Sequence, residues 1–218
     1  PNMATMLCFL TSDVAITPSM LQKALSASVA DTFNMVSVDG DTSTNDMVSI
    51  LANGLAENSP IEEEGTDYRL FLEALTGLNT QLSRAIAGDG EGATKLLECT
   101  VDSAPDLITA KKVAKSVITS SLFKAAMFGA DANWGRVLCA IGYTDAEFEI
   151  DKVEVTLASC KGSVLVCRSG SGVPFDENRA KNILLEREIQ ILISLHQGCE
   201  KATAWGCDLT YDYVKING

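Results

Sequence analysis

The spacing of the apolar residues constrains the fold of this chain more than any other feature of its sequence. Residues 6–11 form a short apolar run with the length of a buried strand. Thr17 and Pro18 then start a helix, because a hydroxyl residue is favoured at the N-cap and proline at the first helical position. Val36 and Val38 indicate a second short strand. The chain therefore opens with a strand, a helix and a strand.

Helical spacing recurs through the rest of the chain. Residues 68–86 carry apolar side chains on one face over several turns, and Gly88 closes the segment as a helix C-terminus commonly does. Residues 47–55 show a shorter pattern of the same kind, through Met47 and Leu51. Further helices are predicted at residues 105–128, 134–141 and 176–187.

Strand-like runs alternate with these helices. Residues 94–101 have the character of a strand, residues 189–195 are a short apolar run, and residues 202–216 alternate almost to the end of the chain. Residues 153–157 and 164–166 also alternate, with Lys161 and Gly162 between them in the position of a tight turn. This pair predicts a β-hairpin.

The order of these elements favours an α+β fold with layered, mixed or antiparallel sheets and flanking helices. A doubly wound parallel fold fits less well, because the hairpin and the closing run are antiparallel in character. With 218 residues and 46% hydrophobic content, the chain can bury one substantial core, or two small cores that share a sheet.

Charge and cysteine usage exclude several classes of partner. The 29 acidic and 17 basic residues give a net charge of −12, and the basic residues form no stripe that could follow phosphates, so no nucleic acid is expected. No apolar run reaches the roughly 20 residues of a membrane span, so no membrane is expected either. The seven cysteines form no closely spaced pair and are expected to be reduced and mostly buried. A cytoplasmic protein is predicted.

The residue types also exclude common catalytic centres. A Ser-His-Asp or Cys-His centre needs a histidine, and His196, the single one here, is interpreted as a structural or surface residue unless a partner chain supplies the base. Residues 39–50 resemble a calcium loop but lack its glycine and final glutamate, so no metal is expected. The polar block 39–46 is either a capped loop or part of a site. Residues 88–95 lack the residue order of a phosphate-binding loop and are predicted to form a turn.

A hydroxyl nucleophile can work without histidine when it is the first residue of a chain. Cutting the bond before a threonine creates an α-amino group with a pKa of about 8 beside the hydroxyl. Ala4 and Thr5 fit such a site, because a small residue precedes the hydroxyl residue and an apolar strand follows. By spacing alone, Thr5 is far more readily interpreted as an ordinary strand-forming residue, because most threonines that start strands are β-branched strand formers.

Five segments, taken in order, resemble the ornithine acetyltransferase (glutamate N-acetyltransferase) family. The first, Pro-Asn-Met-Ala-Thr-Met-Leu at residues 1–7, is similar to the self-cleavage signature of that family. The others lie at residues 38–46, 90–95, 128–136 and 204–214. The resemblance extends over essentially the whole chain.

The resemblance implies that a precursor cuts itself between Ala4 and Thr5, so that residues 1–218 are the β (nucleophile) chain and residues 1–4 the end of the α chain. Thr5 would take an acetyl group from N2-acetyl-L-ornithine and pass it to L-glutamate in arginine biosynthesis, with its freed amino group as the base. Glu91 and Asn217 match family positions that contact substrate. The α chain is the implied partner, in an αβ heterodimer that pairs into a heterotetramer. No cofactor is expected, and acetyl-CoA is a candidate co-substrate for direct synthesis of N-acetylglutamate.

The ends of the chain, Pro1 in place of methionine and a strand-like run that stops at Gly218, indicate a piece of a longer polypeptide. The resemblance implies that oxyanion-hole residues and a substrate-binding lysine lie upstream, and that a further hydroxyl residue follows Asn217. Two alternatives to an acetyltransferase stay open. One is a self-processing amidohydrolase or aminopeptidase with the same kind of nucleophile, and the other is a non-catalytic scaffold in which Thr5 is never unmasked.

Overall fold

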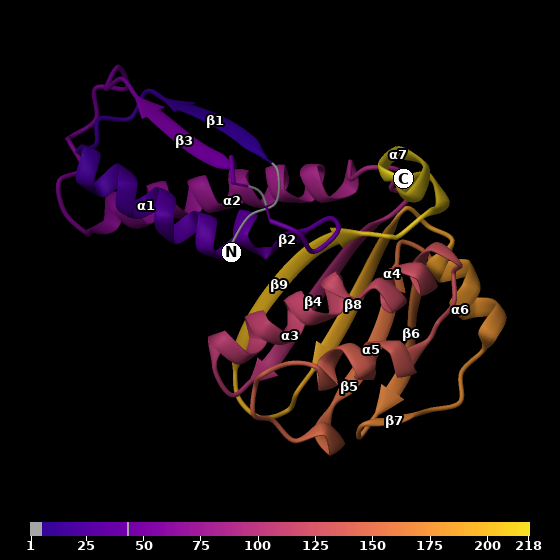
Figure 1. The fold of residues 1–218 in the computed structure, drawn as a ribbon. Coiled ribbons are helices and arrows are strands. Elements are labelled where there is room, and N and C mark those ends of the chain that lie inside the picture. The colour runs from indigo at the N-terminus through magenta and orange to yellow at the C-terminus, as the bar shows by residue number, and fades with distance from the viewer. Residues whose placement is uncertain (1–5, 43) are drawn as a thin grey trace. The chain divides into compact units, whose positions relative to one another are not determined.

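The computed structural model describes residues 6–42 and 44–218, which divide into two compact units (Figure 1). The smaller unit comprises the chain up to Met35 and Asp41–Ser83, and the larger unit comprises Val36–Gly40 and Arg84–Gly218. Ala4 and Thr5, the predicted cleavage site and nucleophile, lie outside the described residues.

Two parallel strands form the sheet of the smaller unit, β1 (Leu7–Ser12) and β3 (Met47–Ala52). They are accompanied by α1 (Pro18–Asp31), the 3-10 helix η1 (Phe33–Met35) and most of α2 (Thr66–Gly88), whose last turn belongs to the larger unit. The predicted first strand and the two predicted helices are confirmed.

One face of this two-stranded sheet is apolar and exposed. Cys8 and Leu10 of β1 are buried, whereas Leu7 and Phe9 on the alternate face are 66% and 64% exposed. Leu51 of β3 lies on the same face, beside β1 in the parallel register, and is 63% exposed. Parallel strands are normally covered on both faces. Within the described chain, therefore, this sheet is only half covered.

The prediction of a helix at residues 47–55 is wrong. The six-residue run of β3 fits a helical period by chance, but it contains the β-branched residues Val48 and Ile50, which favour strands. Asn53 and Gly54 end it, with Gly54 in the left-handed region at φ +75°. All six residues of β3 are paired in register with β1, and a helix this short could not compensate for the loss of that pairing.

The larger unit is built on a seven-stranded mixed sheet, which confirms the predicted fold class. The strand order is β2-β9-β4-β8-β5-β6-β7. The strands are β2 (Val36–Ser37), β4 (Leu96–Ala104), β5 (Glu154–Ser159), β6 (Gly162–Arg168), β7 (Ser171–Gly172), β8 (Glu188–Ser194) and β9 (Glu200–Cys207). Two pairs, β2 with β9 and β4 with β8, are parallel, and the other four are antiparallel. The predicted hairpin is β5–β6, whose turn uses Gly162 at φ +118°.

Helices cover one face of this sheet, and Figure 1 shows α3, α4 and α5 in front of it. The helices are α3 (Leu107–Thr119), α4 (Ser121–Phe128), α5 (Trp134–Gly142) and α6 (Glu177–Leu184), with the 3-10 helix η2 (Ile150–Lys152). Strand β8 shows the asymmetry of the two faces. Ile189, Ile191 and Ile193 are at most 1% exposed, whereas Gln190 and Leu192 alternate with them and are exposed. The core therefore lies between the sheet and these helices.

Residues 105–128 form two helices, α3 and α4, and the prediction of a single helix is wrong. Ser120 separates them with an extended backbone, at φ −68° and ψ 110°. Its hydroxyl accepts a hydrogen bond from the Phe123 amide at 3.3 Å and so caps α4. A serine within an otherwise apolar helical pattern was the available signal for this break.

The prediction that the closing strand runs to Ile216 is also wrong, because β9 ends at Cys207 and residues 211–217 form the helix α7 (Tyr211–Asn217). The hydroxyl of Thr210 accepts a hydrogen bond from the Tyr213 amide at 3.2 Å and caps the helix. Asp212 and Lys215 form an ion pair at 2.7 Å across one turn.

Glycine substitutions at two sites should change stability in opposite directions. A Cβ at Gly206 of β9 would lie 2.4 Å from Ile118 Cγ2 and 2.9 Å from the Ser37 carbonyl oxygen. We expect Gly206→Ala to lower the free energy of unfolding by about 1–3 kcal/mol, since the core must shift. Exposed Gly77 in α2 has nothing within 4 Å, so Gly77→Ala should raise it by about 0.5–1 kcal/mol. Urea denaturation of the two variants in the full-length protein measures both, and a neutral Gly206→Ala would contradict the packing described.

Candidate functional site

Three segments of the larger unit meet where β4 begins and β9 ends. They are the loop 89–95, residues 208–210 and α7, which Figure 1 places beside this end of the sheet. The two predicted substrate-binding residues within the described chain lie here. The side-chain amide of Asn217 donates a hydrogen bond to Oε2 of Glu91 at 2.7 Å, although 126 positions separate the two residues. The structure therefore brings these two predicted residues together.

The hydrogen bond from Asn217 occupies only one of the two carboxylate oxygens of Glu91. The Asn217 amide nitrogen also donates to the Tyr213 carbonyl oxygen at 3.1 Å, which fixes its orientation toward Glu91. Within residues 6–42 and 44–218, Oε1 of Glu91 accepts no hydrogen bond, and both side chains are exposed. An exposed carboxylate held at one oxygen can accept a hydrogen bond from a cationic ligand at the other.

The loop that carries Glu91 needs glycine at its centre. Gly92 has φ +66°, and a Cβ there would lie 2.6 Å from the Tyr213 amide nitrogen. The Ala93 amide closes the turn by donating to the Gly90 carbonyl oxygen at 2.9 Å. The loop backbone thus packs directly against the start of α7, as only glycine allows.

Asp208 ties the end of this loop to the end of β9. Its buried carboxylate accepts hydrogen bonds at Oδ1 from the amides of Thr94 at 2.8 Å and Lys95 at 2.9 Å, and at Oδ2 from the Thr94 hydroxyl. Thr210, two residues later, donates from its hydroxyl to the Gly92 carbonyl oxygen at 2.7 Å. Because Thr210 also caps α7, it connects the backbone beside Glu91 to the helix that carries Asn217.

Two buried lysines hold backbone segments next to the site. Lys95 donates from Nζ to the carbonyl oxygens of Leu184, at 2.7 Å, and Met127. Burial lowers the pKa of its ammonium, and the nearby Asp208 carboxylate opposes that shift. Lys124 donates to the Val38 carbonyl oxygen, and burial likewise lowers its pKa. Both ammonium groups are held by backbone carbonyls inside the fold, so they organise the site rather than face a ligand.

In the smaller unit, the start of β1 is anchored by a carboxylate from the polar block 39–46. The Met6 amide donates to Oδ1 of Asp46 at 2.6 Å. Oδ2 of Asp46 is buried and, among the described residues, accepts no hydrogen bond. Part of the block therefore holds the strand that follows Thr5 in the sequence.

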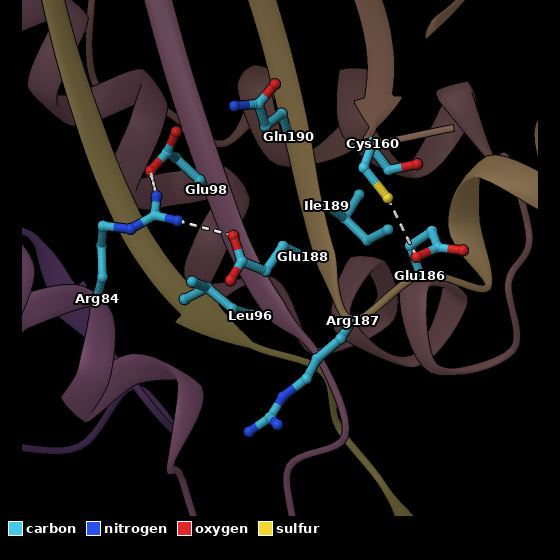
Figure 2. Close-up of a pocket in the computed structure, with 10 residues that line it drawn as sticks. Arg84, Leu96, Glu98, Cys160, Glu186, Arg187, Glu188, Ile189 and Gln190 are labelled. Carbon is cyan, nitrogen blue, oxygen red and sulfur yellow. Dashed lines mark hydrogen bonds and ion pairs between the residues drawn. The ribbon is translucent and has the colours of Figure 1, made fainter. Parts of the chain in front are cut away.

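A separate hollow of about 410 Å³ lies over β4 and β8, and Figure 2 shows its charged lining. Arg84 forms ion pairs with Glu98 and with Glu188, the latter at 2.9 Å, and Glu98 also accepts a hydrogen bond from the Trp205 indole at 2.8 Å. Cys160 donates to Glu186 at 3.2 Å. None of the residues predicted from the sequence lines this hollow, which is distinct from the Glu91–Asn217 site.

Two residues of the 128–136 motif have structural partners. Asn133 caps α5 by accepting a hydrogen bond from the Arg136 amide at 3.2 Å, and the Arg136 guanidinium donates to the Leu122 carbonyl oxygen at 2.8 Å. These contacts hold α5 against α4, so they account for the motif as a helix junction.

In residues 6–42 and 44–218, no group of three or more His, Cys, Asp or Glu side chains is arranged to hold a metal ion, and none of the helices has the length and hydrophobicity of a transmembrane segment. All seven cysteines are free thiols, of which Cys8, Cys99, Cys167 and Cys207 are buried. His196 is exposed, as interpreted from the sequence.

Fold and site together define a layered α+β protein with an exposed, hydrogen-bonded carboxylate–amide pair, Glu91 and Asn217. The family model for the ArgJ family matches residues 1–218. The chain belongs to the ArgJ family.

Similar proteins carry the name of the same family. The chain is 54% identical over 218 residues to the arginine biosynthesis bifunctional protein ArgJ 1 of Clostridium acetobutylicum, and 50% identical to the ArgJ protein of Thermotoga neapolitana. All of this chain aligns with 53% and 55% of those proteins, so it spans about half the length of the curated relatives it matches. A crystal structure of the Bacillus halodurans ArgJ protein matches with a TM-score of 0.93 and 45% identity, over 98% of this chain and 99% of that one.

Replacing the buried lysine beneath the loop should destabilise the fold and weaken its pH dependence. Lys95→Met leaves the Leu184 carbonyl oxygen without its donor and removes one donor from the Met127 carbonyl oxygen, which keeps the Ala130 amide, at a cost of about 1–3 kcal/mol in the free energy of unfolding. Because the folded pKa lies below the ordinary value of 10.5, the unfolded chain binds more protons between the two values, and stability rises with pH in that window. The variant should show a smaller rise as the pH approaches the ordinary lysine value of 10.5 from below.

Urea denaturation of the full-length protein at several pH values measures both effects. Exposed Lys181 provides the matched control, since Lys181→Met should change stability by less than about 0.5 kcal/mol and leave the pH dependence intact. An equal loss in the two variants would contradict the role assigned to Lys95.

Proposed function

We propose that this chain forms the nucleophile-bearing part of an acetyltransferase that moves the acetyl group of N2-acetyl-L-ornithine to L-glutamate in arginine biosynthesis. The observation that carries the proposal is the hydrogen bond between Glu91 and Asn217, two positions that the family resemblance marks as substrate contacts. Membership in the ArgJ family supports it, since the relatives are named arginine biosynthesis bifunctional proteins.

In this proposal Thr5 is the nucleophile. Cleavage of the Ala4–Thr5 bond frees the α-amino group, which takes the proton of the Thr5 hydroxyl as its oxygen attacks the acetyl carbonyl carbon. The C–N bond of acetylornithine breaks, ornithine leaves with a proton, and Thr5 carries an acetyl ester. The amine of glutamate then attacks this ester, the C–O bond breaks, and the hydroxyl of Thr5 recovers its proton.

Glu91 binds the cationic end of the donor. Ornithine derivatives carry a side-chain ammonium, and Oε1 of Glu91 accepts no hydrogen bond within the described residues. Asn217 holds the other carboxylate oxygen, so the ammonium meets a carboxylate whose position is already set. A charge-assisted hydrogen bond of this kind is strengthened when the site excludes water.

The partner in this proposal is the α chain of the same precursor. The chain spans about half the length of its curated relatives, and the apolar face of β1 and β3 with Leu7, Phe9 and Leu51 offers a surface for the remainder to cover. We further propose that two αβ pairs form a heterotetramer. Free thiols at all seven cysteines favour a cytoplasmic location.

Acetyl-CoA is proposed as the donor of a second reaction, the direct acetylation of glutamate. The word bifunctional in the relatives' names supports two activities. No other cofactor enters the proposal.

Intact mass and N-terminal sequencing of the full-length protein test the nucleophile. We expect a chain that begins at Thr5 and gains one acetyl group on exposure to N-acetylornithine without acceptor. Thr5→Ala should remain uncut and unacetylated. Release of free acetate without an acceptor would favour an amidohydrolase instead, and an intact Ala4–Thr5 bond in the native protein would favour a scaffold.

Steady-state kinetics of the processed protein test the binding site. Glu91→Gln removes the negative charge, so we expect the KM for N-acetylornithine to rise about 10- to 100-fold, the loss of a charge-assisted hydrogen bond. Thr210→Val removes the hydrogen bond to the Gly92 carbonyl oxygen beside Glu91 and should raise the KM for N-acetylornithine less. The matched control is Thr203→Val in β9, which removes a hydrogen bond to Thr100 of 3.0 Å within the sheet. It should leave KM unchanged, and an unchanged KM in Glu91→Gln would exclude Glu91 from the donor site.

A further inference from the structure

Helix α7 has no buried side chain of its own, so a few discrete contacts hold it in place. At its start the Thr210 hydroxyl binds the Gly92 carbonyl oxygen, and at its end Asn217 binds Glu91. A helix of seven residues has little stability of its own in water, so its position depends on such contacts. The placement of Asn217 therefore depends on the group that fixes the middle of the helix.

Tyr213 makes the contact in the middle of α7. Its hydroxyl donates a hydrogen bond to Oδ2 of Asp39 at 3.1 Å, across 174 positions of sequence, and both residues belong to the larger unit. The carbonyl oxygen of Tyr213 accepts a hydrogen bond from the Asn217 side-chain amide at 3.1 Å. Tyr213 thus links the Asp39 carboxylate to the side chain that meets Glu91.

Asp39 lies on a well-anchored part of the chain. It follows β2, whose two residues pair in parallel with β9. The carbonyl oxygen of Val38 accepts hydrogen bonds from the buried Lys124 ammonium and from the Cys207 thiol, the latter at 3.8 Å. Asp39 itself is exposed, so its carboxylate is accessible to a side chain on the surface. The acceptor is therefore fixed by the sheet, and α7 is the element that it holds.

We propose that Tyr213 and Asp39 are positioning residues for the donor site, because their hydrogen bond fixes α7 so that Asn217 orients the Glu91 carboxylate toward the ammonium of N-acetylornithine. The inference rests on the proposed function. It also gives the first residue of the polar block 39–46 a role in the site. Neither Tyr213 nor Asp39 touches the acetyl group in this proposal, since both act through Asn217.

A positioning role affects binding and leaves the chemical step unchanged. When the hydrogen bond between Tyr213 and Asp39 is lost, α7 must be ordered as the donor binds, and this ordering weakens the affinity for the donor. Once the donor is bound, the reacting groups are the same, so the acetylation rate at saturating donor is the same. A residue that only stabilised the fold would not produce this separation.

The test is Tyr213→Phe in the full-length, processed protein. The rate of acetylation is measured by intact mass over a range of N-acetylornithine concentrations. The half-saturating concentration should rise about three- to tenfold, the effect expected of one lost hydrogen bond. The maximal rate should change by less than about twofold.

Variants of the acceptor show whether the hydrogen bond itself is responsible. Asp39→Ala should raise the half-saturating concentration as much as Tyr213→Phe does, whereas Asp39→Asn keeps an acceptor oxygen and should retain most of the affinity. The double variant with Tyr213→Phe and Asp39→Ala should bind the donor no more weakly than either single variant, because both changes remove the same interaction.

Tyr211→Phe is the matched control, since it removes the same atom from the same helix. Tyr211 is 76% exposed, and among the described residues its hydroxyl forms no hydrogen bond, while its ring meets Phe128 edge-on with the centroids 5.6 Å apart. Its half-saturating concentration should equal that of the unsubstituted protein. Thermal denaturation establishes that each variant is folded.

The outcomes separate this inference from the proposed function. If the unsubstituted protein is acetylated and Tyr213→Phe keeps its half-saturating concentration, only the role of Tyr213 and Asp39 fails. An equal shift in Tyr211→Phe, or a lower maximal rate without a shift, overturns that role as well. If the unsubstituted protein never gains an acetyl group, the proposed function fails and the inference fails with it.

Discussion

The buried carboxylate of Asp208 organises the candidate site. Both of its oxygens are used, by the amides of Thr94 and Lys95 and by the Thr94 hydroxyl, so it joins the residue after β9 to the residues before β4. Those two strands are antiparallel neighbours, and this junction extends their connection beyond the ladder, together with the hydrogen bond from Thr210 to the Gly92 carbonyl oxygen. Because the loop with Glu91 leads into β4 and the helix with Asn217 follows β9, the position of one side chain relative to the other depends on Asp208. A fully satisfied buried polar network of this kind selects one arrangement of the backbone.

The spacing of apolar residues was sufficient to predict the elements whose structure depends on local interactions. The long amphipathic helix α2 and the hairpin β5–β6 repeat one period over enough residues to exclude alternatives, and both were predicted. Segment 47–52 is different, because a mostly apolar run of six residues fits a helix and a strand about equally and the parallel pairing with β1 decides between them. Residues 211–217 were predicted as strand for a related reason. Their alternation is real, but the hydroxyl of Thr210 caps a helix, and this cap was readable as a threonine three residues before Tyr213.

The site was predictable in part. Glu91 and Asn217 followed from the family resemblance, and no spacing argument could have shown that residues 126 positions apart share a hydrogen bond. Asp208 and Thr210 lie in a segment that resembles the family, but no role was assigned to them, because the strand expected there would have turned alternate side chains to opposite faces of a sheet. Once β9 is seen to end at Cys207, both residues belong to a loop, where Asp and Thr commonly bind backbone groups. The role of Gly92 became clear only from the 2.6 Å approach of α7 to its missing side chain.

Asp46 and Asp208 each anchor the backbone next to a strand, but among the described residues only Asp208 has donors at both carboxylate oxygens. Each carboxylate accepts hydrogen bonds from backbone amides next to a strand, β1 for Asp46 and β4 for Asp208. Asp208 has donors at both oxygens, so its role is complete within the larger unit. Asp46 has a donor at one oxygen among the described residues, while the other is buried. A buried carboxylate oxygen without a donor costs free energy, so Asp46 contributes less to the stability of the smaller unit than the fully bonded Asp208 contributes to that of the larger unit.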